Sequence, residues 1–279
     1  MFDKVTNLGD SCIQHGHKNN RIYLMHLAPK DMPQILDELD SLAKQHTYTK
    51  IFVKIPKKYE IFFSTKNYIA EGFVNKFYDN SEGCVFMAKF LDKRRSTPLN
   101  QEQNEKIIKY AQSKKEFAPL VKVSLPEGCL LREATPSDAE DMAALYSSVF
   151  ESYPFPVFDV EYIKKTMREN IVYFGIWKDH QLIALSSCEM SVEDKNVEMT
   201  DFAILPDHRS QKLSHILLMH MEKEMTKRGI KTAYTIARAV SIGMNCTFGK
   251  NGYDYGGTLI QNTHIGGGLE DMNLWFKPL

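Results

Sequence analysis

The sequence predicts an α/β protein with a mixed sheet, in which strands and helices share one core. Two observations point to this fold. Through the second half of the chain, short apolar segments of strand length alternate with amphipathic segments of helix length. Apolar residues make up 43% of the 279 residues and charged residues 25%, which is ordinary for a globular protein.

A polar stretch over residues 91–118 divides the chain into two parts. We therefore expect an N-terminal domain over residues 1–95, a polar connector over 96–125 and a second domain over 126–279. The middle of the connector, residues 101–115, has the composition of a charged helix.

The bulk charge and composition argue against several classes of function. The 35 basic and 35 acidic side chains give a net charge of zero, so we expect no nucleic-acid partner. No apolar run reaches membrane-spanning length and no signal peptide is recognisable, so we expect a cytoplasmic protein without a membrane partner. The five cysteines never show Cys-x-x-Cys spacing, which predicts reduced thiols and no metal site.

The second domain begins with a strand at residues 129–133 and a helix that starts at Thr135. Pro136 suits the first helical position, and Asp138 stands where an acidic residue completes a capping box. The helix runs to Phe150. The later elements, read from periodicity and turn residues, are a helix at 160–169, a hairpin of 171–177 and 182–188, a strand at 197–205, a helix at 210–228, a strand at 230–237, a helix at 241–250 and strands at 253–260 and 271–276.

The first half resembles the end of the second. A helix is predicted over residues 31–45, a strand over 50–55 and a helix over 60–65. Phe63 and Tyr68 have the same spacing as Phe248 and Tyr253, and the strands 84–90 and 271–276 follow at similar distances. We infer that residues 20–92 repeat part of the second domain. This half lacks the Arg209 turn described next, which predicts a non-catalytic role.

The segment from Ala203 to Leu218 runs from a strand end through a polar turn into an amphipathic helix. The N-terminus of a helix exposes unpaired backbone N–H groups and a partial positive charge, which favour a phosphate or pyrophosphate. Arg209 stands where it could pair with such an anion. An ordinary strand–turn–helix connection without a ligand is the alternative interpretation.

The residues from Pro206 to Ser214 resemble the acetyl-CoA pyrophosphate loop of the GNAT N-acetyltransferases, usually Pro-x-x-Arg-Gly-x-Gly-x-Gly/Ala. The element order of residues 126–279 also matches the GNAT fold. Ser210 and Lys212 replace two of the usual glycines. The resemblance implies that acetyl-CoA is the cosubstrate and that its binding residues are Ile204, Arg209, Ser210, Gln211, Lys212, Leu213 and Ser214.

Acetyl transfer to an amine needs a base, because an ammonium group must lose a proton first. In several GNAT enzymes a Glu five residues before the Ala of this strand end is the base, which corresponds to Glu198. Asp201 lies nearer the turn and could bind the ammonium instead. The alternatives are a solvated carboxylate at Glu198 and a structural contact at Asp201.

Many GNAT enzymes use a Tyr as the acid, four residues before the Gly of a Gly-Phe/Tyr pair. Phe248 occupies that place here and has no proton to give. Asn245, on the same predicted helix, is a candidate contact for the pantetheine arm or simply a polar residue of the helix surface.

Three segments, residues 237–253, 270–276 and 152–156, are similar to the β-lysine N-acetyltransferases, and the likeness extends over nearly the whole chain. That family acetylates the N6 amine of β-lysine to make a neutral compatible solute used in osmoadaptation. Arg238, at the end of a strand, could clamp the carboxylate of such a substrate, and Tyr153, Phe155 and Pro156 could enclose its aliphatic chain. A structural ion pair at Arg238 and a rigid loop at Tyr153 and Phe155 are the alternatives.

Three functions remain open from the sequence. The first is acetyl transfer to a small amino acid, most readily β-lysine, by an enzyme that could be a homodimer. The second is acetyl transfer to another amine, such as a polyamine or a protein lysine. The third is acyl-CoA binding without catalysis, which the altered loop and the missing Tyr would suit.

Overall fold

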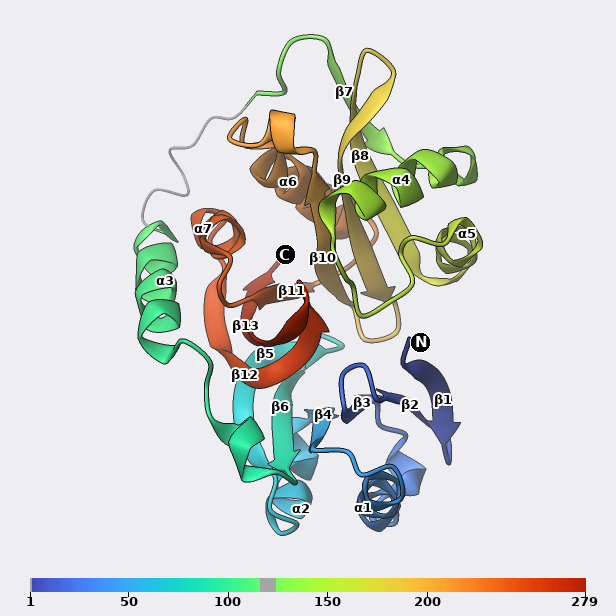
Figure 1. Cartoon of the computed structure of the whole chain (residues 1–279), viewed down its shortest axis with the longest axis vertical. Helices are drawn as coiled ribbons and strands as arrows, with labels where there is room; N and C mark the ends of the chain where they lie inside the picture. Colours follow the sequence, from blue (N-terminus) through green and yellow to red (C-terminus); the bar gives the residue numbers. More distant parts are fainter. Residues whose placement is uncertain (1, 116–123) are drawn as a thin grey trace.

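The computed structural model describes residues 2–115 and 124–279, so part of the predicted connector lies outside the described residues. The strands form one sheet in the order β1-β2-β3-β4-β6-β5-β12-β13-β11-β10-β9-β8-β7. The two predicted domains therefore contribute to a single sheet, with the first half below and the second half above in Figure 1. The predicted domain boundaries themselves stay predictions.

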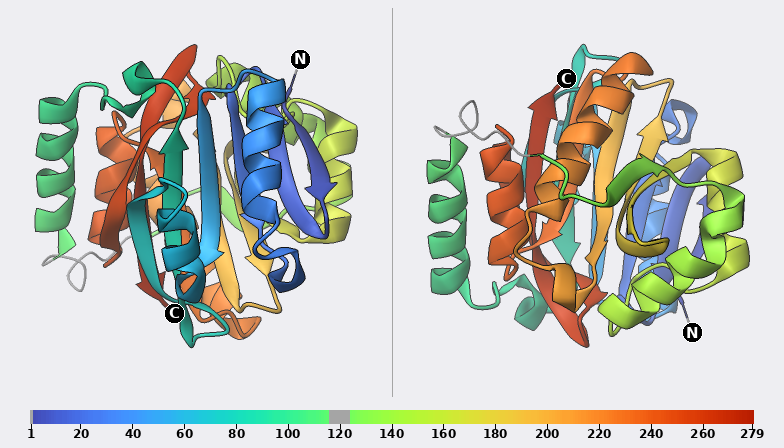
Figure 2. Two further views of the ribbon diagram at one scale, coloured as in Figure 1. Left: turned by 90° about the horizontal axis from the view of Figure 1, so that it is seen from below. Right: turned by 90° about the horizontal axis from the view of Figure 1, so that it is seen from above.

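The first half supplies the strands β1 to β6. Its elements are β1 (Lys4–Leu8), β2 (Ser11–Gly16), β3 (Arg21–His26), η1 (Pro29–Asp31), α1 (Ile35–Gln45), β4 (Lys50–Pro56), η2 (Lys57–Tyr59), α2 (Glu60–Ser64), β5 (Ile69–Tyr78), β6 (Glu82–Phe90), η3 (Lys93–Ser96) and α3 (Gln101–Ser113). Figure 2 shows α1 and α2 lying over the strands of this half.

The second half supplies the strands β7 to β13. Its elements are β7 (Cys129–Glu133), η5 (Pro136–Asp138), α4 (Ala139–Val149), α5 (Val160–Glu169), β8 (Ile171–Lys178), β9 (Gln181–Ser191), β10 (Asn196–Ile204), η6 (Pro206–His208), α6 (Leu213–Lys227), β11 (Thr232–Arg238), α7 (Ile242–Lys250), β12 (Asp254–Ile265) and β13 (Gly268–Pro278). The capping box predicted at Thr135 and Asp138 is present.

The halves join where β5 pairs with β12, at Gly72 and Gly257. Gly257 has a φ of +142°, and a Cβ there would lie 2.1 Å from the carbonyl oxygen of Glu71, so only glycine allows this approach of the two strands. One apolar core spans the join, because Phe52, Phe77 and Phe86 of the first half pack in the same cluster as Tyr234 of the second.

The two halves have the same strand order around their helices. The order β3-β4-β6-β5 of the first half corresponds to β10-β11-β13-β12 of the second, and each half has a parallel pair, β3 with β4 and β10 with β11. The rings of Phe63 and Tyr68 meet edge to face at 5.1 Å, as do those of Phe248 and Tyr253. These matching contacts support the inferred repeat.

The elements predicted in the second half are confirmed, as is the helix in the connector. The strands β1, β2, β3 and β5 were not predicted. Helix α6 begins at Leu213, later than the predicted Ser210, because Ser210 and Lys212 both have left-handed backbone conformations. Among the described residues, no helix combines the length and the apolar character that a membrane span requires.

Candidate active site

The site begins where two parallel strands of the sheet separate. Strands β10 and β11 pair only over Asn196–Glu198 and Thr232–Tyr234. Beyond Glu198 and Tyr234, β10 continues beside β9 alone and β11 beside β13 alone. Beyond this point, residues of both strands line one cavity, and the separated end of β10 leads into the turn before α6.

A bulge in β10 directs Asp201 into this cavity. The pairing with β9 shifts between Thr200 and Ala203, and Asp201 has a φ of +56°. Its carboxylate accepts hydrogen bonds from the hydroxyl of Tyr153 and, at 2.5 Å, from Oγ of Ser187. Burial raises the pKa of Asp201, although these hydrogen bonds oppose the shift. Tyr153, predicted to contact substrate, therefore also positions a carboxylate.

Glu198 lies at the point of separation, opposite a second carboxylate. Glu189 of β9 is its direct cross-strand neighbour. Burial, followed by the negative charge of Glu189, raises the pKa of Glu198 to about 8, and burial also raises the pKa of Glu189. A carboxyl group with this pKa can exchange protons near neutral pH, as a general base must.

The first half of the chain closes the site with residues that were not predicted. Lys54 of β4 lies in the same cavity, with Nζ 3.4 Å from the hydroxyl of Tyr234. The charges of Tyr23, Glu189 and Glu198 outweigh burial and raise the pKa of Lys54. A charged residue inside the apolar segment Ile51–Ile55 was the available sequence signal. Glu189, directly after an apolar strand, carried the same signal.

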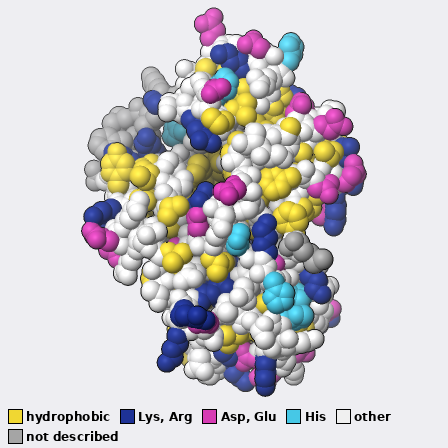
Figure 3. All heavy atoms as spheres, in the orientation of Figure 1, with side chains coloured by type: hydrophobic (Ala, Val, Ile, Leu, Met, Phe, Trp, Pro, Cys, Tyr) yellow, Lys and Arg dark blue, Asp and Glu magenta, His cyan; other side chains and the backbone are white. Residues whose placement is uncertain are grey.

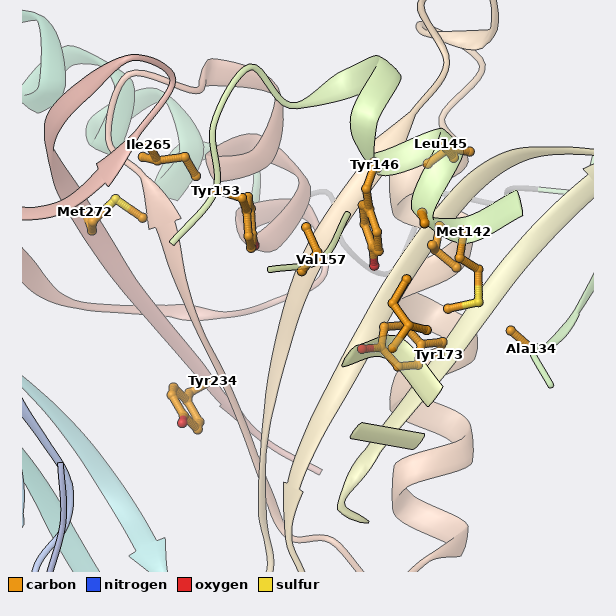
Figure 4. Packing of buried hydrophobic residues seen from close by; sticks show 14 of the residues in the cluster. Ala134, Met142, Leu145, Tyr146, Tyr153, Val157, Tyr173, Tyr234, Ile265 and Met272 are labelled. Atoms are coloured by element: carbon orange, nitrogen blue, oxygen red, sulfur yellow. The ribbon is translucent and has the colours of Figure 1, made fainter. Parts of the chain in front are cut away.

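These residues line a cavity of about 330 Å³ between the two halves. The wall from the second half includes Tyr153, Phe155 and Arg238, as predicted from the sequence, and the wall from the first includes Arg21, Tyr23, Phe52 and Lys54. Figure 4 shows Tyr146 on α4, and Tyr153 and Val157 in the segment that follows this helix. On the face of the molecule that Figure 3 shows, acidic and basic side chains are interspersed.

The predicted cofactor loop is exposed and uncapped. Arg209, Ser210, Gln211 and Lys212 face solvent. Ser210 and Lys212, at the usual glycine places, have φ values of +67° and +60°. No described side chain caps α6, and its first turn contains no acidic residue. Leu213 is buried, and Ser214 lies 3.2 Å from the hydroxyl of Thr247, which anchors α6 beside α7. This loop fits an anion.

Two residues of α7, Asn245 and Phe248, are occupied by contacts within the protein. The amide of Asn245 is fully buried, donates to the carbonyl oxygens of Arg238 and Ser241, and accepts from Asn273 and Trp275. No group remains free for the pantetheine arm, so the amide serves as an internal brace. Phe248 is buried against Phe202 and Tyr253 and supplies no acid.

Arg238 also has a protein partner. Its Nε and Nη2 donate to the carboxylate of Glu270 at 2.8 and 2.5 Å, the paired geometry that a substrate carboxylate would need. The predicted clamp would therefore require Glu270 to give up this contact. Within residues 2–115 and 124–279, no three His, Cys, Asp or Glu side chains gather in a way that could hold a metal ion.

Comparison with known proteins places this site in a family. A family model described as an acetyltransferase (GNAT) domain matches residues 131–254. A β-lysine N(6)-acetyltransferase of Methanococcus maripaludis is 40% identical over 99% of both chains. A β-lysine N(6)-acetyltransferase of Methanosarcina mazei is 33% identical over 88% of this chain and 97% of its own.

A third relative, the N-acetyltransferase YodP of Bacillus subtilis, is 33% identical over the full length of both chains. These matches include the first half, so they cover both walls of the cavity. The chain therefore belongs to the GNAT family of N-acetyltransferases and, within it, to the group that includes the β-lysine N(6)-acetyltransferases.

Proposed function

We propose that this enzyme transfers the acetyl group of acetyl-CoA to the N6 amine of β-lysine, forming N6-acetyl-β-lysine. The observation that carries the proposal is the full-length identity with β-lysine N(6)-acetyltransferases. The cavity is built jointly by both halves, so a match that spans both halves bears on the substrate as well as on the cofactor loop.

The turn before α6 is the proposed site for the pyrophosphate of acetyl-CoA. The backbone N–H groups of residues 210–214 lie at the start of a helix, where the helix dipole favours an anion. Ser210 and Lys212 adopt the left-handed backbone conformations that glycine usually provides in such a turn. Arg209 adds a positive charge, and Ile204 and Leu213 form the apolar ends of the loop.

Glu198 is the proposed base, and Asp201 the proposed contact for the substrate ammonium. Acetyl-CoA supplies a thioester, whose acyl group becomes an amide while the thiol leaves. The amine must be neutral to react, and Glu198 accepts its proton, because burial and Glu189 have raised the pKa of Glu198 toward that of an ammonium group. A thiol has a low enough pKa for the thiolate of coenzyme A to leave without being protonated. Catalysis is therefore compatible with Phe248 at the place where many GNAT enzymes have a Tyr as the acid.

The cavity charges suit such a substrate. β-Lysine carries two ammonium groups and one carboxylate. Glu189, Glu198 and Asp201 place three carboxyl groups in the cavity, where the charge of Lys54 acts on Glu189 and Glu198. The aromatic wall, with Tyr153 and Phe155, can enclose the aliphatic part of the substrate.

An acetyl-CoA assay against β-lysine, α-lysine, spermidine and a lysine-containing peptide tests the proposal. We expect kcat/KM for β-lysine to exceed the others by at least about tenfold, since each unmatched polar group in a closed site is costly. A preference for spermidine or the peptide would contradict the substrate assignment. Binding of coenzyme A without turnover of any amine would contradict catalysis altogether.

A further inference from the structure

Arg21 of β3 is a buried cation whose role the proposed mechanism does not explain. The residue is 4% exposed and lines the cavity opposite the second half. Burial lowers the pKa of Arg21 to about 10, so the side chain remains charged at neutral pH. Burying a charge is unfavourable unless a partner compensates for the lost water. Arg21 nevertheless forms no ion pair with any carboxylate of the described residues.

The guanidinium is fixed on one side and free on the other. Nη1 donates to the carbonyl oxygen of Asn262 and lies 3.3 Å from Oγ1 of Thr263, both on β12. Nε is buried without a hydrogen-bond partner, and the hydrogen bonds that the guanidinium makes to described residues both come from Nη1. Nε and Nη2 form the edge of a guanidinium that binds a carboxylate through two parallel hydrogen bonds. Arg238 uses this same edge to hold Glu270.

The surroundings of Arg21 favour a zwitterionic ligand. Its guanidinium lies 5.3 and 5.6 Å from the rings of Tyr23 and Phe52, which form an apolar floor of the cavity. Lys50, the register partner of Arg21, precedes Lys54 by four residues, roughly 13 Å along β4. Lys54 is near Glu189 and Glu198. A free cationic edge and a group of carboxylates therefore mark separate parts of one cavity.

Resting on the proposed function, we propose that Arg21 binds the substrate carboxylate through Nε and Nη2, so that the first half determines specificity for amino acids over simple amines. The substrate then lies across Tyr23 and Phe52, with its carboxylate at Arg21 and its reacting amine toward Glu198. This assignment leaves Arg238 with Glu270 and gives the buried Arg21 a carboxylate in direct contact, in addition to the nearby charges of Asp3 and Glu71.

The test compares β-lysine with β-lysinamide, in which a neutral amide replaces the carboxylate and both amines remain. Wild-type enzyme should acetylate β-lysine with a kcat/KM roughly 10- to 100-fold higher than β-lysinamide, as expected for loss of a buried charge-assisted contact. Arg21→Gln should remove this preference, by raising KM for β-lysine while leaving β-lysinamide nearly unchanged. Arg21→Lys keeps the charge without the paired edge and should restore only part of the preference.

Arg94→Gln is the matched control, because the side chain of Arg94 is exposed in the same half and is not among the residues that line the cavity. It should leave both substrates unaffected, and thermal melting should show that each variant is folded. Arg238→Gln is the rival, and a selective loss there but not in Arg21→Gln would overturn the assignment. Equal use of the two substrates by wild-type enzyme would overturn it even if Arg21→Gln does not fold.

The two proposals can fail separately. If wild-type enzyme prefers another amine that bears a carboxylate, the substrate assignment is wrong, and Arg21 is tested with that amine and its carboxamide. If β-lysine is the substrate but Arg21→Gln lowers turnover of both forms equally, only the role of Arg21 is wrong. A preferred amine without any carboxylate overturns both.

Discussion

The turn after β3 and the turn after β10 join equivalent elements in the two halves, yet their charged residues are arranged differently. Both pass through a short 3₁₀ segment that begins with proline, Pro29 in the first half and Pro206 in the second. In the first half, Asp31 ends this segment and its carboxylate is held by the backbone of Asp10 and Ser11. In the second half, the exposed Arg209 follows the segment and no acid occupies the first turn of α6.

This difference shows how one architecture can serve two purposes. Asp37 and Glu38 in the first turn of α1 repel an anion, so the N-terminus of α1 is unsuited to the role that we propose for the N-terminus of α6. The parallel pairs are alike in length, since β3 and β4 pair over four positions, Arg21–Leu24 with Lys50–Val53, and β10 and β11 over three, Asn196–Glu198 with Thr232–Tyr234.

The largest expected effect concerns Glu198, where β10 and β11 separate. Glu198→Gln should lower kcat by about 10²- to 10⁴-fold, the usual contribution of a positioned base, while acetyl-CoA affinity stays unchanged. Steady-state kinetics and calorimetry measure the two quantities. Glu38→Gln, at an exposed acid in the first half, is the control and should have wild-type kinetics. An undiminished kcat in Glu198→Gln would show that the base lies elsewhere.

The difference between the two turns itself is tested next. Arg209→Ala should weaken acetyl-CoA binding by about tenfold, because it removes a charge-assisted contact at an exposed site. Lys30→Ala removes an exposed cation from the corresponding turn of the first half and should leave the affinity unchanged. Titration calorimetry with acetyl-CoA distinguishes the two variants. Equal losses in both, or none in Arg209→Ala, would contradict the assignment of the pyrophosphate site.

The raised pKa of Glu198 predicts a dependence on pH. Because the carboxyl must be ionised to accept a proton, kcat/KM should rise about tenfold between pH 7 and pH 9, with an apparent pKa near 8. Glu198→Gln should abolish this rise, and a pH–rate profile measures it. A profile that is flat over this range would show that ionisation of Glu198 does not control kcat/KM.

The same shift affects stability. The pKa of Glu198 is about 8 in the folded protein against an ordinary value of 4.5. Its contribution to stability is therefore fully present below pH 4.5 and is lost as the pH rises through 8. Glu198→Gln should then melt at a higher temperature than wild-type enzyme at pH 9 and show little difference at pH 4.5. A lower melting temperature at pH 9 would contradict the linkage.

The smallest expected effect comes from the loop backbone. Ser210 and Lys212 both have positive φ, which costs a side-chain-bearing residue about 1–2 kcal/mol, partly offset by the greater unfolded-state freedom of glycine. Ser210→Gly or Lys212→Gly should raise the free energy of unfolding by about 0.5–1 kcal/mol, measured by denaturant titration. Ser137→Gly, at a turn with ordinary backbone, should not stabilise the protein.

The sequence predicted the second half well because its elements follow strong local rules. The capping box at Thr135 and the hairpin at residues 178–181 are specified by neighbouring residues. The repeat in the first half became visible through one pair of aromatic residues, Phe63 and Tyr68. Strands β1 to β3 were missed because their pattern is irregular and includes buried polar residues such as Gln14, His15 and Arg21.

Only the residues that the second half contributes to the cavity were predicted. The sequence pointed to Glu198, Asp201 and Tyr153, which the structure brings together. It gave no indication of Arg21 or Lys54, because their position depends on how the sheet continues from one half into the other. Local periodicity contains no information about such long-range pairing, and the burial of a charged residue in an apolar strand was the remaining signal.

The position of the new amide tests the central claim most directly. Wild-type enzyme is incubated with β-lysine and acetyl-CoA labelled with ¹³C in its acetyl group, and the product is analysed by NMR. We predict that the labelled acetyl carbon couples through an amide to the N6 methylene of β-lysine and that the N3 amine stays free. Acetylation at N3, or no amide product, would contradict this account of the site.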